Sequence, residues 1–156
     1  MRLATIRING GETAAIMTAG GAVPIAAVNA TRGTAWKENL YDLIRLGQLP
    51  GLTGWYNQGG RNELASMRGR IPAHEIRYAP LYRCPRRIFG IGLNYTDHAA
   101  DIGSAAPEGF PGSFYKQADT IIGPGDEICL PELKEAQKTT AEAELGIILG
   151  KDCRNV

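Results

Sequence analysis

The chain has 156 residues, and its 17 Lys and Arg residues nearly balance its 16 Asp and Glu residues. A net charge of +1 excludes a long basic tail and provides no whole-molecule field that would attract nucleic acid or an anionic membrane. A hydrophobic content of 44% is enough to bury a core in one or two small domains. The 20 Gly and 9 Pro residues predict short strands joined by many turns.

Membrane and export signals are not evident in the sequence. No stretch approaches the ~20 apolar residues that a membrane span requires, and the first residues lack the apolar core of a signal peptide. We therefore expect a cytoplasmic protein with neither a membrane nor nucleic acid as a partner. Cys84, Cys129 and Cys153 are far apart and form no CxxC motif, so we interpret them as buried thiols rather than a disulfide framework or a zinc site.

The N-terminal part of the chain favours short β-strands. Residues 2–8, 13–17 and 22–28 are rich in β-forming side chains. Asn-Gly-Gly and Ala-Gly-Gly separate them, and such sequences supply the positive φ angles of hairpin turns. The pattern predicts a three-stranded meander.

The next segments give one clear helix and one ambiguous region. Residues 39–46 place Leu40, Leu43 and Ile44 on one stripe and end at Gly47, which predicts a short helix. Residues 53–67 have a weak helical pattern that a Gly-Gly pair interrupts, and they give no firm prediction.

A domain boundary is expected between Pro72 and Pro80, because residues that precede proline disfavour helix and the character of the chain changes there. We assign residues 1–75 to a small β-rich N-terminal domain. Residues 76–156 form the start of a second domain.

The second domain begins with an apolar strand over residues 87–93. Asn94 is expected to cap a helix that runs to Ile102 and ends at Gly103. Three further strands are expected in the ranges 113–116, 120–122 and 127–130, with a tight turn at residues 123–126.

Glu142 and Glu144 are separated by one residue at the start of an apolar run, 141–150. On a strand both side chains would point to the same face. Two carboxylates ~7 Å apart repel by roughly 2 kcal/mol at an effective dielectric of ~20, and a divalent cation between them reverses that sign. Carboxylates without nearby His or Cys suit Mg²⁺, Mn²⁺ or Ca²⁺ rather than zinc. The spacing also fits a solvated helix over 132–144, on which the two side chains would face different sides.

His98 and Asp101 lie three residues apart on the predicted helix, where the carboxylate could orient the imidazole as a general base. A surface His beside a surface Asp is the alternative. Lys116 could pair with a substrate carboxylate or be an ordinary exposed strand lysine. His74, in a proline-flanked connector, is given no functional role.

A dinucleotide-binding fingerprint is excluded. Gly90 and Gly92 follow a strand, but Tyr95 occupies the position of the third glycine. The acidic residue expected about 20 positions later, at the end of a second strand, is also missing.

Four ordered motifs, in residues 91–101, 114–116, 122–131 and 142–151, resemble the fumarylacetoacetate hydrolase family. The similarity is strong from residue 86 to residue 156, and residues 1–46 look like the small β-rich N-terminal domain of many bacterial and fungal members. Within the family, the chain resembles the bacterial and fungal acylpyruvate hydrolases and 2-hydroxyhepta-2,4-diene-1,7-dioate isomerases.

The resemblance implies an α+β, mainly β fold: a mixed β-sandwich roll, incomplete in this chain, in a homodimer. It also implies a cofactor, Mg²⁺ or Mn²⁺ with Ca²⁺ as an alternative, and a small-molecule 2-oxo acid as substrate. The implied reaction is hydrolysis of a carbon–carbon bond in a 2-oxo or β-diketo acid through a metal-bound enolate. Isomerisation and decarboxylation are the alternatives within the same family.

The resemblance also assigns roles to individual residues. Glu142 and Glu144 match the two metal-binding glutamates, and His98 matches the histidine that helps to generate the nucleophilic hydroxide. Asp101 stands where several relatives have Glu, which is one methylene longer. Tyr95 and Lys116 are the candidate substrate-binding residues.

Family members are generally longer, and their third carboxylate ligand falls beyond the point where this sequence stops. We therefore expect the chain to be the N-terminal part of a longer protein, with a missing C-terminal segment or a companion chain. The alternative is a non-catalytic binding half that is inert until complemented.

Overall fold

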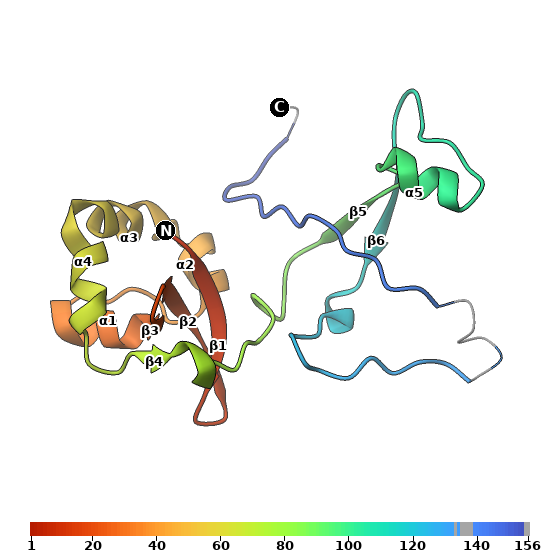
Figure 1. Ribbon diagram of the computed structural model, residues 1–156. Coiled ribbons are helices and arrows are strands. Elements are labelled where there is room, and N and C mark those ends of the chain that lie inside the picture. Colours follow the sequence, from red (N-terminus) through yellow and green to blue (C-terminus); the bar gives the residue numbers. More distant parts are fainter. Residues whose placement is uncertain (133, 135–138, 155–156) are drawn as a thin grey trace. The chain divides into compact units, whose positions relative to one another are not determined.

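Figure 1 presents a computed structural model of the chain, which describes residues 1–132, 134 and 139–154. The chain forms two compact units. The first contains Met1–Tyr82 and Ile122–Val156, and the second contains Arg83–Ile121. The predicted division into residues 1–75 and 76–156 stays a prediction.

The first unit is built on a four-stranded antiparallel sheet. Its strands follow the order β1 (Leu3–Ile8), β2 (Gly11–Thr18), β3 (Gly21–Pro24) and β4 (Ile71–Pro72). Asn9 and Gly10, with φ angles of 50° and 78°, form the turn between β1 and β2. Two successive positive φ angles match the twist of a hairpin, so the Asn-Gly signal predicted this turn correctly.

The third predicted strand is wrong beyond Pro24. Helix α1 (Ile25–Arg32) begins there, where residues 25–28 were expected to continue the strand. Ile25 and Val28 lie three residues apart, and both are fully buried. One face of a helix therefore accommodates the β-branched side chains that suggested a strand.

The predicted helix over residues 39–46 is confirmed as α2 (Leu40–Arg45). The side-chain oxygen of Asn39 accepts hydrogen bonds from the backbone N–H groups of Tyr41 and Asp42 at 2.9 and 3.3 Å. This cap satisfies donors that the first helical turn leaves open. Gly47 follows the helix with a φ of 66°.

The region without a firm prediction is helical. It comprises α3 (Leu49–Trp55), a π-helical turn (Tyr56–Gly60), α4 (Arg61–Glu63) and a 3₁₀ turn (Leu64–Ser66). Gly59 has a φ of 118°, and this non-helical residue separates α3 from α4. The Gly-Gly pair thus divides the helical segment into two parts.

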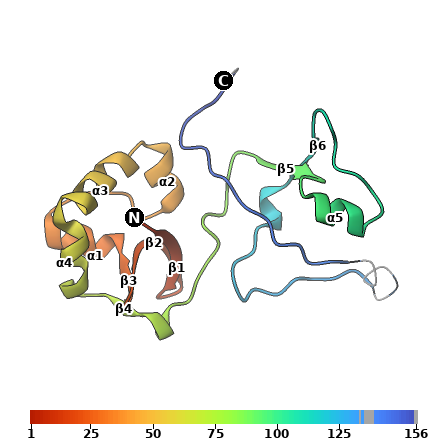
Figure 2. The same ribbon diagram turned by 45° about the horizontal axis from the view of Figure 1, so that its top comes forward.

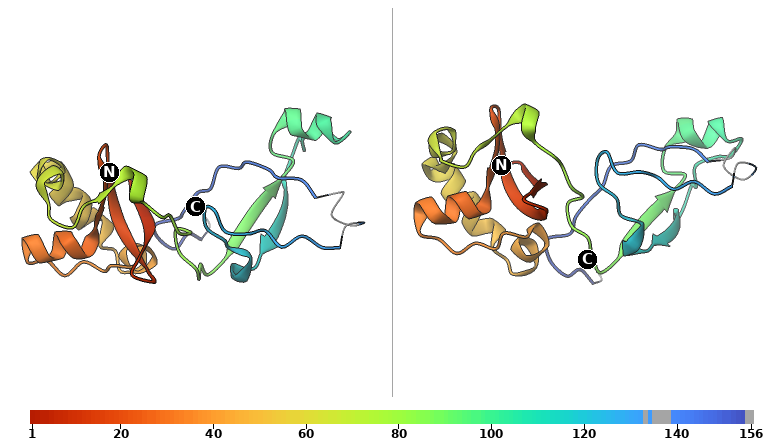
Figure 3. Two further views of the ribbon diagram at one scale, coloured as in Figure 1. Left: turned by 60° about the horizontal axis from the view of Figure 1, so that its bottom comes forward. Right: turned by 90° about the horizontal axis from the view of Figure 1, so that it is seen from below.

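The main core lies between one face of the sheet and the helices, which gather on that side in Figures 1 and 3. Its buried members are Ala14, Ile16, Val23, Ile25, Val28, Leu40, Leu43, Leu52, Leu64 and Met67. The strand residues among them alternate along the chain, because successive side chains of a strand point to opposite faces.

On the other face of the sheet, Ile71 of β4 and Ile76 of the connector that follows it pack against a second, smaller core. Ile6, Ala15 and Ala22 are buried on this face. The backbone N–H of Arg7 donates to the carbonyl of Arg77 at 2.7 Å, and further bonds along β1 hold the same connector. Both faces of this small sheet are therefore buried.

The second unit contains an antiparallel strand pair, β5 (Ile88–Gly92) and β6 (Gly112–Lys116), and the helix α5 (Thr96–Asp101). The helix follows directly from the end of β5 (Figure 2). The expected Asn94 cap is wrong, because Tyr95 is the N-cap, and its side chain accepts no hydrogen bond from the first turn of the helix. Leu93 bends the chain and delays the helix by one residue. The predicted stop at Gly103 is confirmed by its φ of 69°.

The predicted turn at residues 123–126 is confirmed. The N–H of Asp126 donates to the carbonyl of Gly123 at 3.0 Å, and Gly125 has a φ of 82°. The Asp126 carboxylate accepts two hydrogen bonds from the Arg7 guanidinium, at 2.7 and 2.8 Å. Both bonds come from the Nη2 atom of Arg7, and this charge-assisted contact attaches the segment to β1 of the same unit.

The expected strands at 120–122 and 127–130 are wrong. Residues 141–150, for which a strand and a helix were both open, form neither. A 3₁₀ turn (Ala118–Thr120) precedes residue 121, and the residues of these ranges form no strand. Leu145 and Ile147 are both 79% exposed. A strand needs a neighbouring backbone with which to pair, and within the described ranges the ladders involve only β1 to β6 apart from one isolated bridge.

The interpretation of the cysteines as buried thiols is also wrong. Cys84, Cys129 and Cys153 are all exposed, and all three are free thiols. They lie in irregular segments rather than on strands or helices. The apolar character of a thiol is insufficient for burial where no packed element carries it.

The mixed helix and strand content of the predicted fold is confirmed, and both sheets are open and antiparallel. The β-sandwich roll stays a prediction. Among the residues with described structure, no helix has the length and apolar character needed to cross a membrane.

Tyr82 is expected to make the free energy of unfolding depend on pH in the alkaline range. Burial raises the pKa of this phenol above its ordinary value of 10.0, and Tyr41, whose ring centroid lies 5.4 Å away, raises the pKa further. The folded state thus favours the neutral phenol, so its contribution to stability is present below about pH 10 and is lost as pH rises through the raised pKa.

Tyr82→Phe should therefore flatten the loss of unfolding free energy between about pH 9 and pH 11. Urea denaturation followed at both pH values checks this. The exposed Tyr78 offers a matched control, because Tyr78→Phe should leave the wild-type pH dependence unchanged. Equal pH dependence in the wild type and Tyr82→Phe would contradict the assignment.

Candidate functional site

The chain turns sharply where β5 leads into α5. Leu93 has a φ of 57°, a left-handed conformation that is uncommon for a residue other than glycine. Such a conformation costs about 1–2 kcal/mol, and strained residues cluster at functional sites. The turn directs the chain into α5, which carries the candidate base.

His98 lies on α5 as the sequence predicts, and its side chain is half-buried. Asp101 is the last residue of the same helix and is exposed. Residues three apart lie on neighbouring positions of a helix surface. Ala99, between them, is buried and anchors the helix.

Lys116 lies on β6 and shares a strand face with Phe114, two residues before it. The Lys116 Nζ atom lies 5.8 Å from the centroid of the Phe114 ring, within the range of a cation–π contact. A Cβ atom at Gly90, which pairs with Phe114 across the strands, would lie 2.4 Å from that ring. The absence of a side chain at Gly90 therefore leaves the space that the Phe114 ring occupies.

Phe114 is the residue whose part in this arrangement the sequence analysis missed. The available signal was the Phe-x-Lys spacing on a strand together with the glycine-rich partner strand. Only the register of β5 against β6 shows that Gly90 faces Phe114.

The opposite face of the strand pair is aromatic and exposed. The rings of Phe89 and Tyr115 meet edge to face at 5.3 Å, with exposed fractions of 54% and 68%. Tyr95, at the N-cap of α5, is also exposed. The Phe89 and Tyr115 rings thus lie on one face of the strand pair, and the Lys116 ammonium lies with Phe114 on the other.

Glu142 and Glu144 are exposed and lie in an irregular segment. The alternative helix over 132–144 includes residues 133 and 135–138, which fall outside the described residues. Within the described ranges, no group of three His, Cys, Asp or Glu side chains is placed to hold a metal ion. The two carboxylates are hard oxygen donors of the kind that Mg²⁺, Mn²⁺ and Ca²⁺ prefer.

The candidate residues divide between the two units. Tyr95, His98, Asp101 and Lys116 belong to the unit Arg83–Ile121. Glu142 and Glu144 belong to the unit that contains Ile122–Val156. His98 and Asp101 therefore share one helix, whereas Lys116 pairs with Ile88 at the end of the strand pair that lies away from the chain's entry into α5. The glutamates lie in a separate segment.

All six candidate residues lie in a segment that matches a known domain. Residues 87–156 match the family model of the fumarylacetoacetate (FAA) hydrolase C-terminal domain. This segment is similar to the fumarylacetoacetate hydrolase family. The match confirms the resemblance that the four motifs indicated, and it begins one residue before β5.

Individual relatives match about half of the chain. A protein of Archaeoglobus fulgidus is 36% identical over 86 residues, which are 55% of this chain and 33% of that protein. Proteins of Burkholderia cenocepacia and Burkholderia ambifaria, each named "Putative hydrolase", are 44% identical over 70 residues, which are 45% of this chain and 24% of theirs. The matched segment thus spans only a quarter to a third of these relatives. No solved structure matches the chain.

Proposed function

We propose that this fumarylacetoacetate hydrolase segment belongs to a divalent-metal-dependent hydrolase that cleaves a carbon–carbon bond in an acylpyruvate-like 2-oxo or β-diketo acid. One observation carries the proposal: His98, Lys116 and the Glu142–Glu144 pair all fall within the family match over residues 87–156. The name "Putative hydrolase" of the Burkholderia relatives supports the same class of reaction.

In the proposed reaction, His98 takes a proton from the attacking water, and the resulting hydroxide adds to the distal carbonyl of the substrate. The bond between that carbonyl carbon and its neighbour then breaks, which yields a carboxylic acid and an enolate that is protonated to a 2-oxo acid. Asp101 orients the imidazole, and Lys116 with Tyr95 binds the anionic substrate.

Glu142 and Glu144 would hold the divalent cation in this proposal. When bound, the cation would supply Lewis-acid polarisation of the substrate oxygens. Isomerase and decarboxylase reactions of the same family are the alternatives, and product analysis by NMR separates them, because only hydrolysis yields two acids and only decarboxylation releases carbon dioxide.

The metal assignment is tested by calorimetric titration of the 156-residue chain with Mg²⁺ and Mn²⁺. We expect saturable binding, and we expect Glu142→Gln and Glu144→Gln each to weaken it by about tenfold or more, since each removes a charged ligand. The rise in the thermal unfolding temperature on addition of metal should likewise be larger in the wild type than in either variant, because an ion that binds only the folded state stabilises it.

Glu127→Gln is the matched control. Glu127 is exposed in the same segment and loses the same charge on substitution, so metal affinity should stay within about twofold of the wild type. Equal affinity of the wild type and Glu142→Gln would contradict the ligand assignment. Absence of saturable binding in the wild type would instead favour a non-catalytic binding half.

A further inference from the structure

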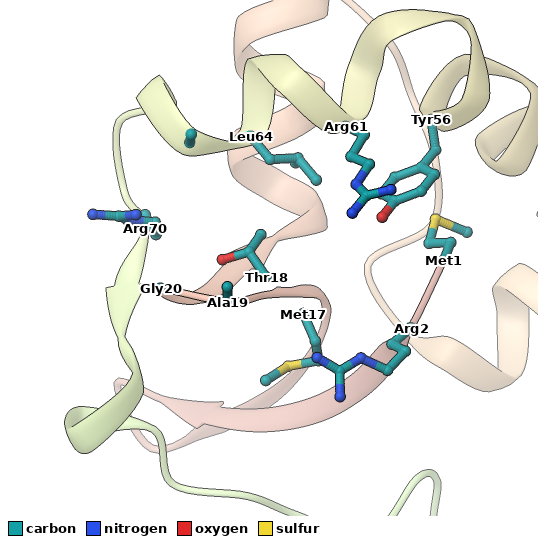
Figure 4. Close-up of a pocket in the computed structure, with 11 residues that line it drawn as sticks. Met1, Arg2, Met17, Thr18, Ala19, Gly20, Tyr56, Arg61, Leu64 and Arg70 are labelled. Atoms are coloured by element: carbon teal, nitrogen blue, oxygen red, sulfur yellow. The ribbon is translucent and has the colours of Figure 1, made fainter.

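The first unit contains an open pocket of about 450 Å³ that lies outside the family match (Figure 4). Basic side chains from three separate segments line it: Arg2 before β1, Arg61 at the start of α4 and Arg70 before β4. Its lining contains no acidic residue. A cluster of one sign of charge in a concave surface raises the local concentration of ions of the opposite sign.

The three guanidinium groups have no partners within the described part of the chain. Arg2, Arg61 and Arg70 form no side-chain hydrogen bond or ion pair there, whereas Arg7 and Arg32 each pair with a carboxylate. All three side chains are exposed, and their guanidinium groups are therefore available for charge-assisted hydrogen bonds to an anionic ligand in the pocket.

The positive charge is spread along the pocket. Figure 4 shows Arg70 at one end and Arg61 with Tyr56 at the other. A Cβ atom at Gly20 would lie 2.8 Å from the Arg70 Nη1 atom, so the guanidinium rests against bare backbone at the β2–β3 turn. Separated cationic groups match an anion whose charges are themselves separated.

The pocket wall between its two ends has both apolar and polar side chains. Leu64 is 1% exposed and forms an apolar part of the wall. The Thr18 hydroxyl donates to the Gly21 carbonyl at 3.0 Å, so it faces the pocket as an acceptor, and Tyr56 brings a phenol that can donate. A short carbon skeleton with polar substituents fits such a lining better than a compact inorganic anion.

We propose that this pocket binds a small organic polycarboxylate in which at least two carboxylate groups are separated by a short carbon chain. The site is independent of the proposed metal-dependent reaction, because its lining residues come from Met1–Tyr82. Arg61 and Arg70 bind carboxylates at opposite ends, and the apolar wall contacts the carbon skeleton.

Calorimetric titration of the full chain with citrate at low ionic strength tests the proposal. We expect one saturable site, and we expect Arg61→Gln and Arg70→Gln each to weaken citrate binding by about tenfold or more, since each removes a charge-assisted bidentate contact. Inorganic phosphate should bind at least about tenfold more weakly than citrate, because a single compact anion reaches only one end.

Arg68→Gln is the matched control. Arg68 is exposed and close in sequence to Arg70 but does not line the pocket, so its removal should change affinity by no more than about twofold. Arg61 and Arg70 are themselves exposed, and both variants should retain the wild-type urea midpoint. The proposal is overturned if citrate shows no saturable binding, if phosphate binds equally well, or if Arg68→Gln weakens binding as much as the pocket variants.

Discussion

His98→Gln is expected to lower kcat for acylpyruvate hydrolysis by about 10²–10⁴-fold, the usual contribution of a general base. The amide can donate and accept hydrogen bonds, but it cannot take the proton of the attacking water. His98 lies on α5 directly after the strained turn at Leu93, and its side chain is only half-buried, so the substitution should leave the fold intact. Initial rates of acylpyruvate loss at saturating Mg²⁺ give the measurement.

His74→Gln is the internal control for this loss, because the chain contains only these two histidines. His74 has an exposed side chain beside Glu75, outside the family match. We expect its substitution to change kcat by less than about twofold. Equal losses in the two variants, or an unchanged rate in His98→Gln, would remove His98 from the proposed reaction. The wild type, His98→Gln and His74→Gln should bind metal with the same affinity. A loss of kcat in His98→Gln can then be attributed to the missing base rather than to weaker metal binding.

Gly21→Ala is expected to cost about 2–4 kcal/mol of unfolding free energy. Gly21 has a φ of 145°, and an added Cβ would lie 1.9 Å from the carbonyl oxygen of Ile71. The neighbour is backbone rather than the end of a flexible side chain, so β4 would have to move away from β3. That movement opens the sheet face on which Ala22 is buried.

Gly11→Ala is the control for this stability loss. Gly11 also lies at a strand end, but its backbone conformation is ordinary and its nearest neighbour would be 3.6 Å from the new Cβ. Its unfolding free energy should change by less than about 1 kcal/mol. Urea denaturation followed by tryptophan fluorescence measures both variants, because Trp36 and Trp55 are the two tryptophans and lie in the first unit. Similar midpoints for the two variants would refute the predicted clash.

Local signals explain most of what the sequence predicted correctly about the fold. The Asn9-Gly10 turn, the α2 stripe with its stop at Gly47, and the turn at residues 123–126 each depend on a few adjacent residues. The α1 helix was missed because Ile25 and Val28 satisfy both a strand pattern and a helical face. Their burial against the sheet decides between the two, and burial depends on distant parts of the chain.

In the candidate site, too, some features depend on adjacent residues and others on distant parts of the chain. Tyr95, His98 and Asp101 fall within seven consecutive residues, so their association could be predicted from the motif and the expected helix. The role of Gly90 in seating Phe114 depends on a strand register that no local pattern specifies. The position of the glutamates relative to His98 stays a prediction.

The sequence by itself determined the first hairpin, the α2 helix and the similarity of residues 87–156 to the fumarylacetoacetate hydrolase family, because all of these are encoded in short contiguous patterns. Only the tertiary structure revealed the arginine-lined pocket, since Arg2, Arg61 and Arg70 come from segments far apart in the chain. It also decided that the cysteines are exposed and that residues 25–28 are helical. Packing between distant segments sets burial and side-chain proximity, and neither quantity is a property of a local sequence.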